Sequence, residues 1–354
     1  MAIDMKTRKL LESAFELASK KYIPFQEPNY TTYSSIYIGP TSNTKDAIKL
    51  YNNYTNVMAS TLWFGLEAAL GGAKRVDLFD INELQILYGK YILAAIKVLK
   101  YEDFIKYFTL PEMKYKYNIK NDFNNILASQ LFDDLSKARV LSSDVELFFG
   151  NLYNWYSNYE LILSALFRFE HPISLDYLKR FSSFYNEEEY YKLQKILRSD
   201  KCQLTYNQVS LVDVPDKFSL EYNLIILDNI LQYYKKNPGL NTVQLVDQFI
   251  KQGLSRLVSL DGTIQVNYGF QVAADLFGEY FDIPEKKTLD IFKKLELESL
   301  FAKKEDINVL LYEGYSDYTY DIIPGVEGYA ANNLVINYKK RIKKVEKGLD
   351  KYLQ

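Results

Sequence analysis

The sequence of 354 residues contains one cysteine and one histidine. The single cysteine, Cys202, excludes an intramolecular disulfide and any zinc site that needs several cysteines. A Ser-His-Asp triad would have to use His171, which stands before Pro172, and no nucleophile-elbow motif lies near it. We therefore interpret His171 as a loop residue.

Strong charge bias and long apolar runs are also missing. The chain has 43 basic and 45 acidic residues and a net charge of -2, so no global field attracts it to nucleic acid or anionic membranes. No apolar run approaches the roughly eighteen residues of a membrane span. The N-terminus is amphipathic and charged, which is not typical of a signal peptide. We expect a cytoplasmic protein and leave the oligomeric state open.

Apolar and aromatic residues are plentiful. Hydrophobic residues make up 48% of the chain, which argues against disorder, and the length allows a large core. Aromatic residues make up 16%, mostly 32 Tyr and 21 Phe. Because Tyr, Lys, Asn and Ile share A/T-rich codons, an AT-rich genome explains the tyrosines more simply than a binding surface does.

A β-prone run at residues 75–79 ends at Asp80, and a helical pattern begins directly after Asn82. A strand that ends in an acid and turns into a helix is typical of the second βα unit of a nucleotide-binding sheet. There the carboxylate accepts hydrogen bonds from ribose hydroxyls. The alternative is that Asp80 only caps the next helix, since Asp and Asn are preferred caps.

Further β-like runs alternate with helical patterns along the chain. They predict an α/β fold with a Rossmann-like, seven-stranded, mostly parallel sheet and a large helical insertion. The predicted strand order is 3-2-1-4-5-7-6. In sequence order the predicted strands are 56–60, 75–79, 204–212, 222–227, 263–268, 308–312 and 333–338.

The same patterns divide the chain into five segments. These are an N-terminal helix and lid segment at 1–50, a first half of the Rossmann-like domain at 51–104, a helical insertion at 105–200, a second half at 201–338 and a basic C-terminal helix at 339–354. We expect the insertion to form a helical cap over the carboxyl ends of the strands. The lysines of the last segment are interpreted as a solvated face, with nucleic-acid contact as the alternative.

Several short motifs carry a resemblance to a known family. They are GAKRV through DIN at 72–82, LKYEDF at 99–104, YNLIILDNILQYY at 222–234, DGTI at 261–264 and a Thr-Ser-Asn segment at 41–43. In this order they resemble the class I S-adenosylmethionine-dependent transferases. More narrowly, they resemble the aminocarboxypropyl transferase-like family of betaine-lipid synthesis and its uncharacterised bacterial relatives. Those relatives share a strand–DIN–helix run and a "YDLIILSNI" strand.

The resemblance implies roles for particular residues. Asp80 would hold the ribose hydroxyls of S-adenosylmethionine, and Asp213 would accept a hydrogen bond from the adenine amino group. Three residues of the first turn would face the methionine carboxylate at a helix N-terminus; they are Ser60, Thr61 and Gly65. Three others, at the carboxyl end of the fourth strand, would orient the acceptor or take its proton; they are Asp228, Asn229 and Tyr233. For Asp228 and Asn229 the alternative is strand-end turn and cap chemistry.

One departure leaves two functions open. Family members place glycines after the first strand, whereas this chain has Ser60-Thr61 followed by bulky residues and only Gly65. We expect the turn to span 60–65 and the next helix to span 66–70. The bulky residues, Leu62, Trp63 and Phe64, could fill the cofactor pocket. We therefore expect either a transferase that moves a methyl or aminocarboxypropyl group to a small-molecule or macromolecular acceptor, or a non-catalytic binding module with a degenerate site. No metal site is expected.

Overall fold

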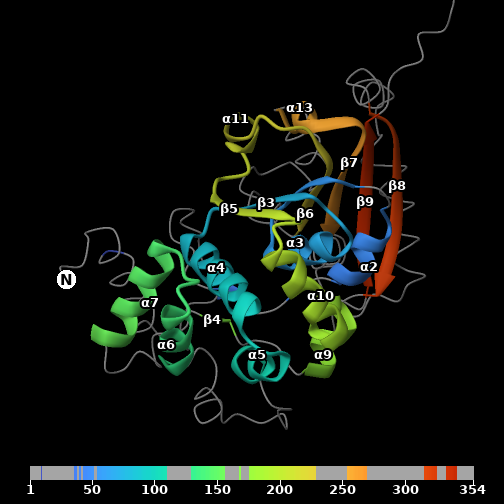
Figure 1. Ribbon diagram of the computed structural model, residues 1–354. Coiled ribbons are helices and arrows are strands. Elements are labelled where there is room, and N and C mark those ends of the chain that lie inside the picture. Colours follow the sequence, from blue (N-terminus) through green and yellow to red (C-terminus); the bar gives the residue numbers. More distant parts are fainter. Residues whose placement is uncertain are drawn as a thin grey trace, which may run out of the picture. The chain divides into compact units, whose positions relative to one another are not determined.

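The computed structural model describes part of the chain, shown as coloured ribbon in Figure 1. The described residues are 9, 36–37, 40, 43–51, 54–109, 129–155, 167–168, 175–228, 253–268, 315–324 and 332–340. Several of the sequence interpretations fall outside these residues, among them those on His171, Asn229, Tyr233, the strand 308–312 and the segment 341–354.

One seven-stranded sheet has the hydrogen-bonded order β5-β3-β2-β6-β7-β9-β8. The β3–β5 and β6–β7 pairs are parallel, whereas β9 pairs antiparallel with β7 and β8. The predicted α/β, Rossmann-like, mostly parallel fold and its strand order are therefore confirmed. The strands are β2 (Asn56–Ala59), β3 (Arg75–Asp80), β5 (Gln203–Gln208), β6 (Tyr222–Asp228), β7 (Val258–Tyr268), β8 (Tyr315–Pro324) and β9 (Asn332–Lys340).

Several strand boundaries differ from the prediction, among them the start of β7, which lies at Val258 instead of residue 263. The third strand, β5, ends at Gln208, because the chain enters a turn that leads to Pro215 in the first turn of helix α11 (Val214–Lys217). The sixth strand of the sheet in chain order is β8, at 315–324, while the predicted range 308–312 lies outside the described residues. Lys339 and Lys340 belong to β9, so the predicted basic helix does not begin at 339.

The chain divides into two compact units. The first contains Met1–Asn53 and Ala59–Leu211, and the second contains Tyr54–Met58 and Val212–Gln354. Strand β2 contributes residues to both. The five segments expected from the sequence stay a prediction.

In the first unit, helices α3 (Leu62–Leu70) and α4 (Glu83–Val98) pack on one face of β3 and β5. A Cβ at Gly65 would lie 2.6 Å from Leu78 Cδ2, so only a glycine lets α3 approach β3 this closely. In the same way, the absent side chain at Gly89 leaves room for the ring of Tyr206 on β5. These two contacts set the spacing of the helix layer on the sheet.

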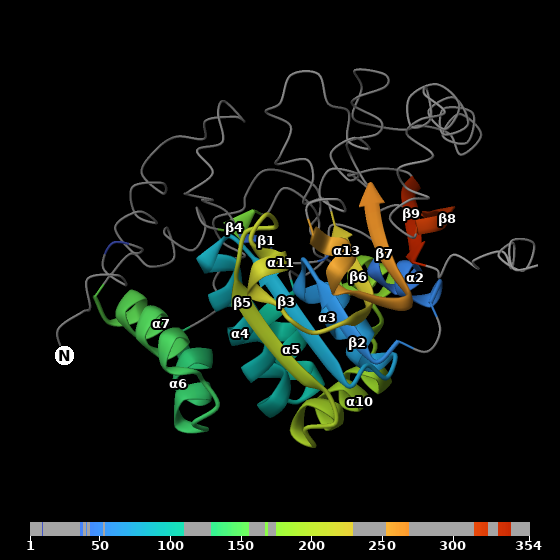
Figure 2. The same cartoon turned by 90° about the horizontal axis from the view of Figure 1, so that it is seen from above.

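The described part of the region predicted as a helical insertion is mostly helical. Its helices are α5 (Tyr101–Phe108), α6 (Ser129–Lys137), α7 (Ser143–Trp155), α9 (Leu175–Phe181), the short 3-10 helix η2 (Ser183–Tyr185) and α10 (Glu187–Arg198). Figures 1 and 2 show α6 and α7 beside α4. The exception is β4 (Phe167–Arg168), which pairs in parallel with β1 (Ile36–Tyr37) where a helix was expected. None of the described helices is long and apolar enough to cross a membrane.

The cap prediction is wrong for α10. The Gln194 side-chain amide donates to the carbonyls of Ile96 and Leu99, both at 2.7 Å, and Arg198 Nε donates to the carbonyl of Lys97 at 2.5 Å. These carbonyls lie at the carboxyl end of α4, and the chain then passes from α10 into the start of β5. Since a helix that follows a strand runs back to the strand's amino-terminal end, α10 lies at the amino-terminal edge of β3 and β5. It therefore does not cover their carboxyl ends.

Aromatic rings fill the space between α3 and this helical region. Trp63 stacks on Phe184 with ring centroids 5.9 Å apart and planes inclined by 6°. Phe104 contacts Phe184 and Tyr190 at 6.2 and 5.1 Å. Such offset and edge contacts add about 0.5–1.5 kcal/mol per pair beyond burial. Much of the chain's high aromatic content thus builds a core.

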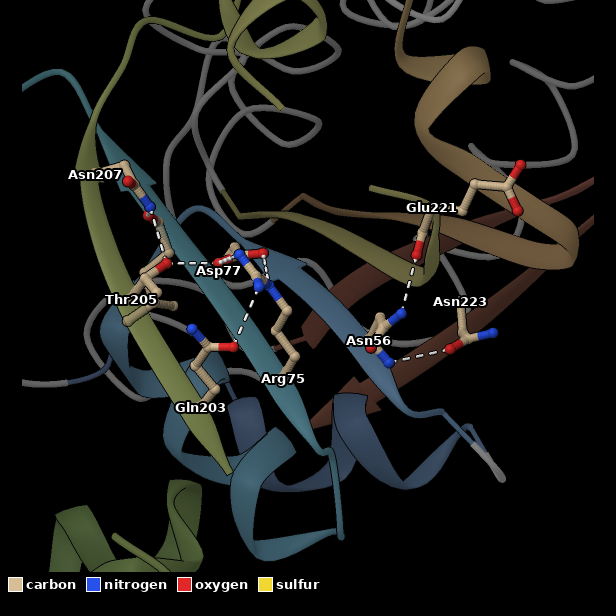
Figure 3. A network of polar contacts seen from close by, with 9 residues as sticks. Asn56, Arg75, Asp77, Gln203, Thr205, Asn207, Glu221 and Asn223 are labelled. Carbon is tan, nitrogen blue, oxygen red and sulfur yellow. Dashed lines mark hydrogen bonds and ion pairs between the residues drawn. The ribbon is translucent and has the colours of Figure 1, made fainter. Parts of the chain in front are cut away.

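A polar network covers the opposite face of β3 and β5 (Figure 3). The Asp77 carboxylate is fully buried and accepts hydrogen bonds from Arg75 Nε at 2.7 Å and Arg75 Nη2 at 3.1 Å. It also accepts a hydrogen bond from Thr205 Oγ1 at 2.5 Å, and Asn207 donates to Thr205 at 3.0 Å. Because a buried carboxylate is costly without such partners, these bonds specify the register of the two strands.

In the second unit, Asn223 joins the beginnings of three strands; Figure 3 shows its contact with Asn56. Its Oδ1 accepts hydrogen bonds from the Thr55 N–H at 3.1 Å, the Thr55 hydroxyl at 2.6 Å and the Asn56 N–H at 3.0 Å. Its Nδ2 donates to Ser259 Oγ at 3.2 Å. The register between β6 and β7 shifts at this point, which leaves the amide free to face these groups.

Replacing Gly89 by Ala should destabilise the protein by about 1–3 kcal/mol, because the new methyl group overlaps the Tyr206 ring. Chemical denaturation measures the effect. Gly150→Ala in α7 is the control: its Cβ would lie 3.2 Å from Phe132 Cζ, the far end of a ring. There, higher helix propensity should offset part of any loss, up to about 1 kcal/mol. Equal effects at both positions would contradict the proposed clash.

Candidate functional site

The turn between β2 and α3 is shorter than predicted. Helix α3 begins at Leu62 rather than Leu66, so the turn consists of Ser60 and Thr61 alone. Thr61 is the N-cap residue, with an extended backbone, yet its hydroxyl makes no capping hydrogen bond. Among the described side chains, Thr61 Oγ1 is a buried atom without a hydrogen-bond partner. A buried hydroxyl left unpaired is unfavourable, so this atom is suited to a polar ligand.

Gly65 lies inside α3, not in the turn. Its N–H donates to the Thr61 carbonyl at 3.3 Å within the helix. The side chains of Leu78 and Val76 occupy the space next to Gly65 that a Cβ would need. This packing accounts for a glycine at the position. Its role at the cofactor stays a prediction.

The three bulky residues after Thr61 all belong to α3 and are buried. Trp63 faces η2, where its ring lies 5.9 Å from Phe184 and 6.3 Å from Tyr185. These contacts explain why large apolar residues follow the turn, since they anchor η2 on the helix.

Asp80 closes the turn between β3 and α4. Its Oδ1 accepts a hydrogen bond from the Asn82 N–H at 2.8 Å, and Asn82 Oδ1 in turn accepts from the Leu84 N–H at 3.0 Å. Asn82 is thus the N-cap of α4, and Asp80 supports it from one step outside the helix. Asp80 therefore does not cap α4 directly, as the alternative from the sequence supposed. It accepts a hydrogen bond from Asn82, and Asn82 caps the helix.

The protonation of Asp80 is shifted by its surroundings. Burial raises the pKa of the carboxyl to about 7, against the opposing effect of hydrogen bonds from the Asn82 and Ile81 N–H groups. The residue nevertheless keeps some solvent exposure. An acid that is partly protonated near neutral pH can either accept or donate a hydrogen bond to a ligand hydroxyl.

Tyr206 is a neighbour of Asp80 that the sequence did not reveal. It lies on β5 with 9% of its surface exposed, and its hydroxyl has no hydrogen-bond partner among the described atoms. Burial, followed by the charge of Asp80, raises the pKa of the phenol well above its usual value. The available signal was Gly89, since a glycine inside an apolar helix often marks a large side chain packed against it.

A second acid, Glu67, is buried in α3 and was also missed. Its carboxylate accepts hydrogen bonds from the Ser182 hydroxyl at 2.8 Å and from the Ser183 N–H. Burial raises the pKa of Glu67, and these hydrogen bonds and the charge of Lys45 oppose that shift. Because both partners lie at η2, Glu67 holds this segment on α3. The feature of the sequence that could have revealed Glu67 is its place as the one acid in the apolar helix LWFGLEAAL.

Two predicted site residues lie in the second unit. Asp213 is exposed and begins helix α11, five residues beyond the end of β5, so it does not end the third strand as predicted. Asp228 is the last residue of β6 and only 4% of its surface is exposed, as expected for an acid at a strand end. The first unit therefore contains Ser60, Thr61 and Asp80, at the ends of neighbouring strands β2 and β3.

No protein-family model matches this chain, and no curated protein matches it. Among solved structures it is similar to the N-methyltransferase NodS from Bradyrhizobium japonicum WM9 in complex with S-adenosyl-L-homocysteine, with 8% identity and a TM-score of 0.32, covering 93% of this chain and 97% of that one. A putative S-adenosylmethionine-dependent methyltransferase from Listeria monocytogenes has 12% identity and a TM-score of 0.33, with coverage of 85% and 98%. Similarities at this level establish no activity or ligand for this chain.

Thermal unfolding should reveal the raised pKa of Asp80. The folded protein binds this proton more tightly than the unfolded chain, so stability falls as pH rises from about 4 to about 7 and the loss then levels off. Asp80→Asn keeps the acceptor for the Asn82 N–H but does not titrate. Its melting temperature relative to wild type should therefore rise across this window. Parallel curves for the two proteins would show that Asp80 titrates normally.

Proposed function

We propose that this protein binds S-adenosylmethionine through its first unit and transfers a methyl or aminocarboxypropyl group to an acceptor. The observation that carries the proposal is the buried Thr61 hydroxyl at the N-terminus of α3, which has no hydrogen-bond partner among the residues that the structure describes. A helix N-terminus favours an anionic group, and Thr61 Oγ1 can donate to a carboxylate there. The fold supports this reading, since open α/β sheets bind ligands at the carboxyl ends of their strands.

Each residue has a proposed part in binding. Ser60 and Thr61, in the turn before α3, hold the methionine carboxylate, and Gly65 lies in the first turn of the helix. Asp80, at the next strand end, receives the ribose hydroxyls.

The proposed chemistry places few demands on the protein. When bound, the cofactor supplies carbons attached to a sulfonium sulfur, and a nucleophile that attacks one of these carbons displaces a neutral thioether. The protein's own residues then align the acceptor and remove its proton, which is the part assigned to Asp228, Asn229 and Tyr233. Alignment of the two reactants supplies much of the rate in such reactions.

A non-catalytic binding module is the second candidate. The observation that favours it is the turn itself, which has no glycine, while the Gly65 N–H is already used inside α3. A backbone of this kind offers fewer N–H groups for close approach of a ligand. In this case the same fold would serve as a scaffold for a partner.

Calorimetric titration with S-adenosylmethionine and S-adenosylhomocysteine tests the proposal. Asp80→Ala should weaken binding by about 10- to 100-fold, since hydrogen bonds to a charged group are each worth roughly 1.5–3 kcal/mol. Thr61→Val, which removes only the hydroxyl, should weaken binding about tenfold by the same reasoning. Asp176→Ala, an exposed acid of α9, is the matched control and should leave the affinity unchanged.

The absence of saturable binding by wild type at millimolar cofactor would reject the transferase and leave the binding module. Where binding is found, the released product identifies the reaction with any acceptor tried. Methyl transfer releases S-adenosylhomocysteine, whereas aminocarboxypropyl transfer releases 5′-methylthioadenosine.

A further inference from the structure

Basic side chains gather at the amino-terminal edge of β3 and β5 in the first unit. They come from the segments before these strands, from the ends of α4 and α10, and from the residue before α5. All six are exposed; they are Lys74, Lys97, Lys100, Lys195, Arg198 and Lys201. We call this set the basic edge.

Hydrogen bonds show that these segments are contiguous. Arg198 Nε donates to the Lys97 carbonyl at 2.5 Å, which joins the ends of α10 and α4. The Gln203 N–H donates to the Lys74 carbonyl at 2.8 Å, which joins the starts of β5 and β3. Lys201 stands between Arg198 and Gln203 in the chain, so it lies on the same edge.

Charge balance makes this cluster unusual for the chain. The whole sequence has almost equal numbers of acids and bases, 45 and 43. Within the basic edge the one intervening acid is Asp200. Three acids lie on its border, Glu102 and Asp103 in the first turn of α5 and Glu187 in the first turn of α10. The local field is therefore positive although the global field is not.

Helix dipoles explain only part of the cluster. Cations near the carboxyl ends of α4 and α10 are favoured by the dipole, which accounts for Lys97, Lys195 and Arg198. Lys74 and Lys201 follow the carboxyl ends of α3 and α10 by four and three residues, beyond the last turn, where the dipole effect is weaker. Lys100 is the N-cap residue of α5, where a cation is disfavoured. The dipoles therefore do not account for Lys100.

An aromatic ring lies among the cations. Tyr191 of α10 is 38% exposed, and its hydroxyl accepts a hydrogen bond from the Tyr101 N–H at 3.3 Å, directly after Lys100. On the helix it stands one turn before Lys195 and one turn after Glu187, so the three share a face. An exposed ring beside cations is typical of surfaces that bind single-stranded nucleic acid, where bases stack on rings and lysines track phosphates.

We propose that the basic edge binds single-stranded nucleic acid. Its lysines neutralise successive phosphates, and Tyr191 provides a surface on which a base stacks. An acidic peptide would not use the ring, and a membrane would need exposed aliphatic side chains for insertion, which the described basic edge lacks. The site lies at the edge opposite to the proposed cofactor site and does not depend on cofactor binding.

Fluorescence anisotropy with a labelled oligouridylate of about 20 nucleotides tests the proposal. Wild type should bind with an affinity that falls steeply between about 50 and 200 mM salt, as expected for neutralised phosphates. The variant Lys100→Glu/Lys195→Glu/Lys201→Glu should bind at least tenfold more weakly, and its salt slope should fall by about 2, or 0.7 for each lost contact. Tyr191→Leu should weaken binding about fivefold or more, because it removes the stacking ring.

The control is Lys49→Glu/Lys106→Glu/Lys137→Glu, which makes the same change of charge at exposed positions of α2 (Thr44–Lys49), α5 and α6. It should retain most of the binding. Equal losses in both triple variants, or no binding by wild type at low salt, would overturn the proposal. Should the first variant fail to fold, the same three changes to Gln carry the test.

Two further probes separate the other partners. Polyglutamate that binds as tightly as the oligonucleotide would overturn the proposal in favour of an acidic protein. Tighter binding to vesicles of phosphatidylserine would overturn it in favour of a membrane surface. A Tyr191→Leu protein that binds as well as wild type would overturn the assignment to single strands.

Discussion

The close approach of two helices to two strands is the constraint on which the first unit depends. Interiors are packed to crystal-like density, so the space that a glycine leaves must be filled by a neighbour. Leu78 and Val76 fill it at Gly65, and the Tyr206 ring fills it at Gly89. With the helices held at this distance, the first residues of α3 and α4 lie where β2 and β3 end. Thr61 and Asp80 owe their positions to this packing.

Local signals in the sequence predicted the elements that need no distant partner. The run before Asp80 and the apolar run of β6 are β-prone and bounded by polar residues, and both strands were found within one residue of their predicted ends. The start of α3 was misplaced by four residues because Leu62, Trp63 and Phe64 carry no helix signal of their own. They are helical because Trp63 packs on η2, a segment more than a hundred residues away.

The sequence likewise predicted some residues of the candidate site and missed others. Asp80 could be found because a carboxylate at a strand end is a local pattern, but its raised pKa and its support of Asn82 depend on burial and turn geometry. Tyr206 could not be found, since its importance follows from Gly89 on another element. The sum of charges also concealed the basic edge, because a near-zero total says nothing about how charges are distributed over a surface.

The contact between Gly89 and Tyr206 also limits how this chain can change over time. The two positions share one volume, so a side chain at 89 becomes acceptable only after the ring at 206 has been replaced by something smaller. In related sequences the two positions should therefore vary together, and the loss of the ring should come first. Such a lineage would also lose the phenol beside Asp80. A change in the packing of the core would therefore also change the electrostatic surroundings of the acid at the end of β3.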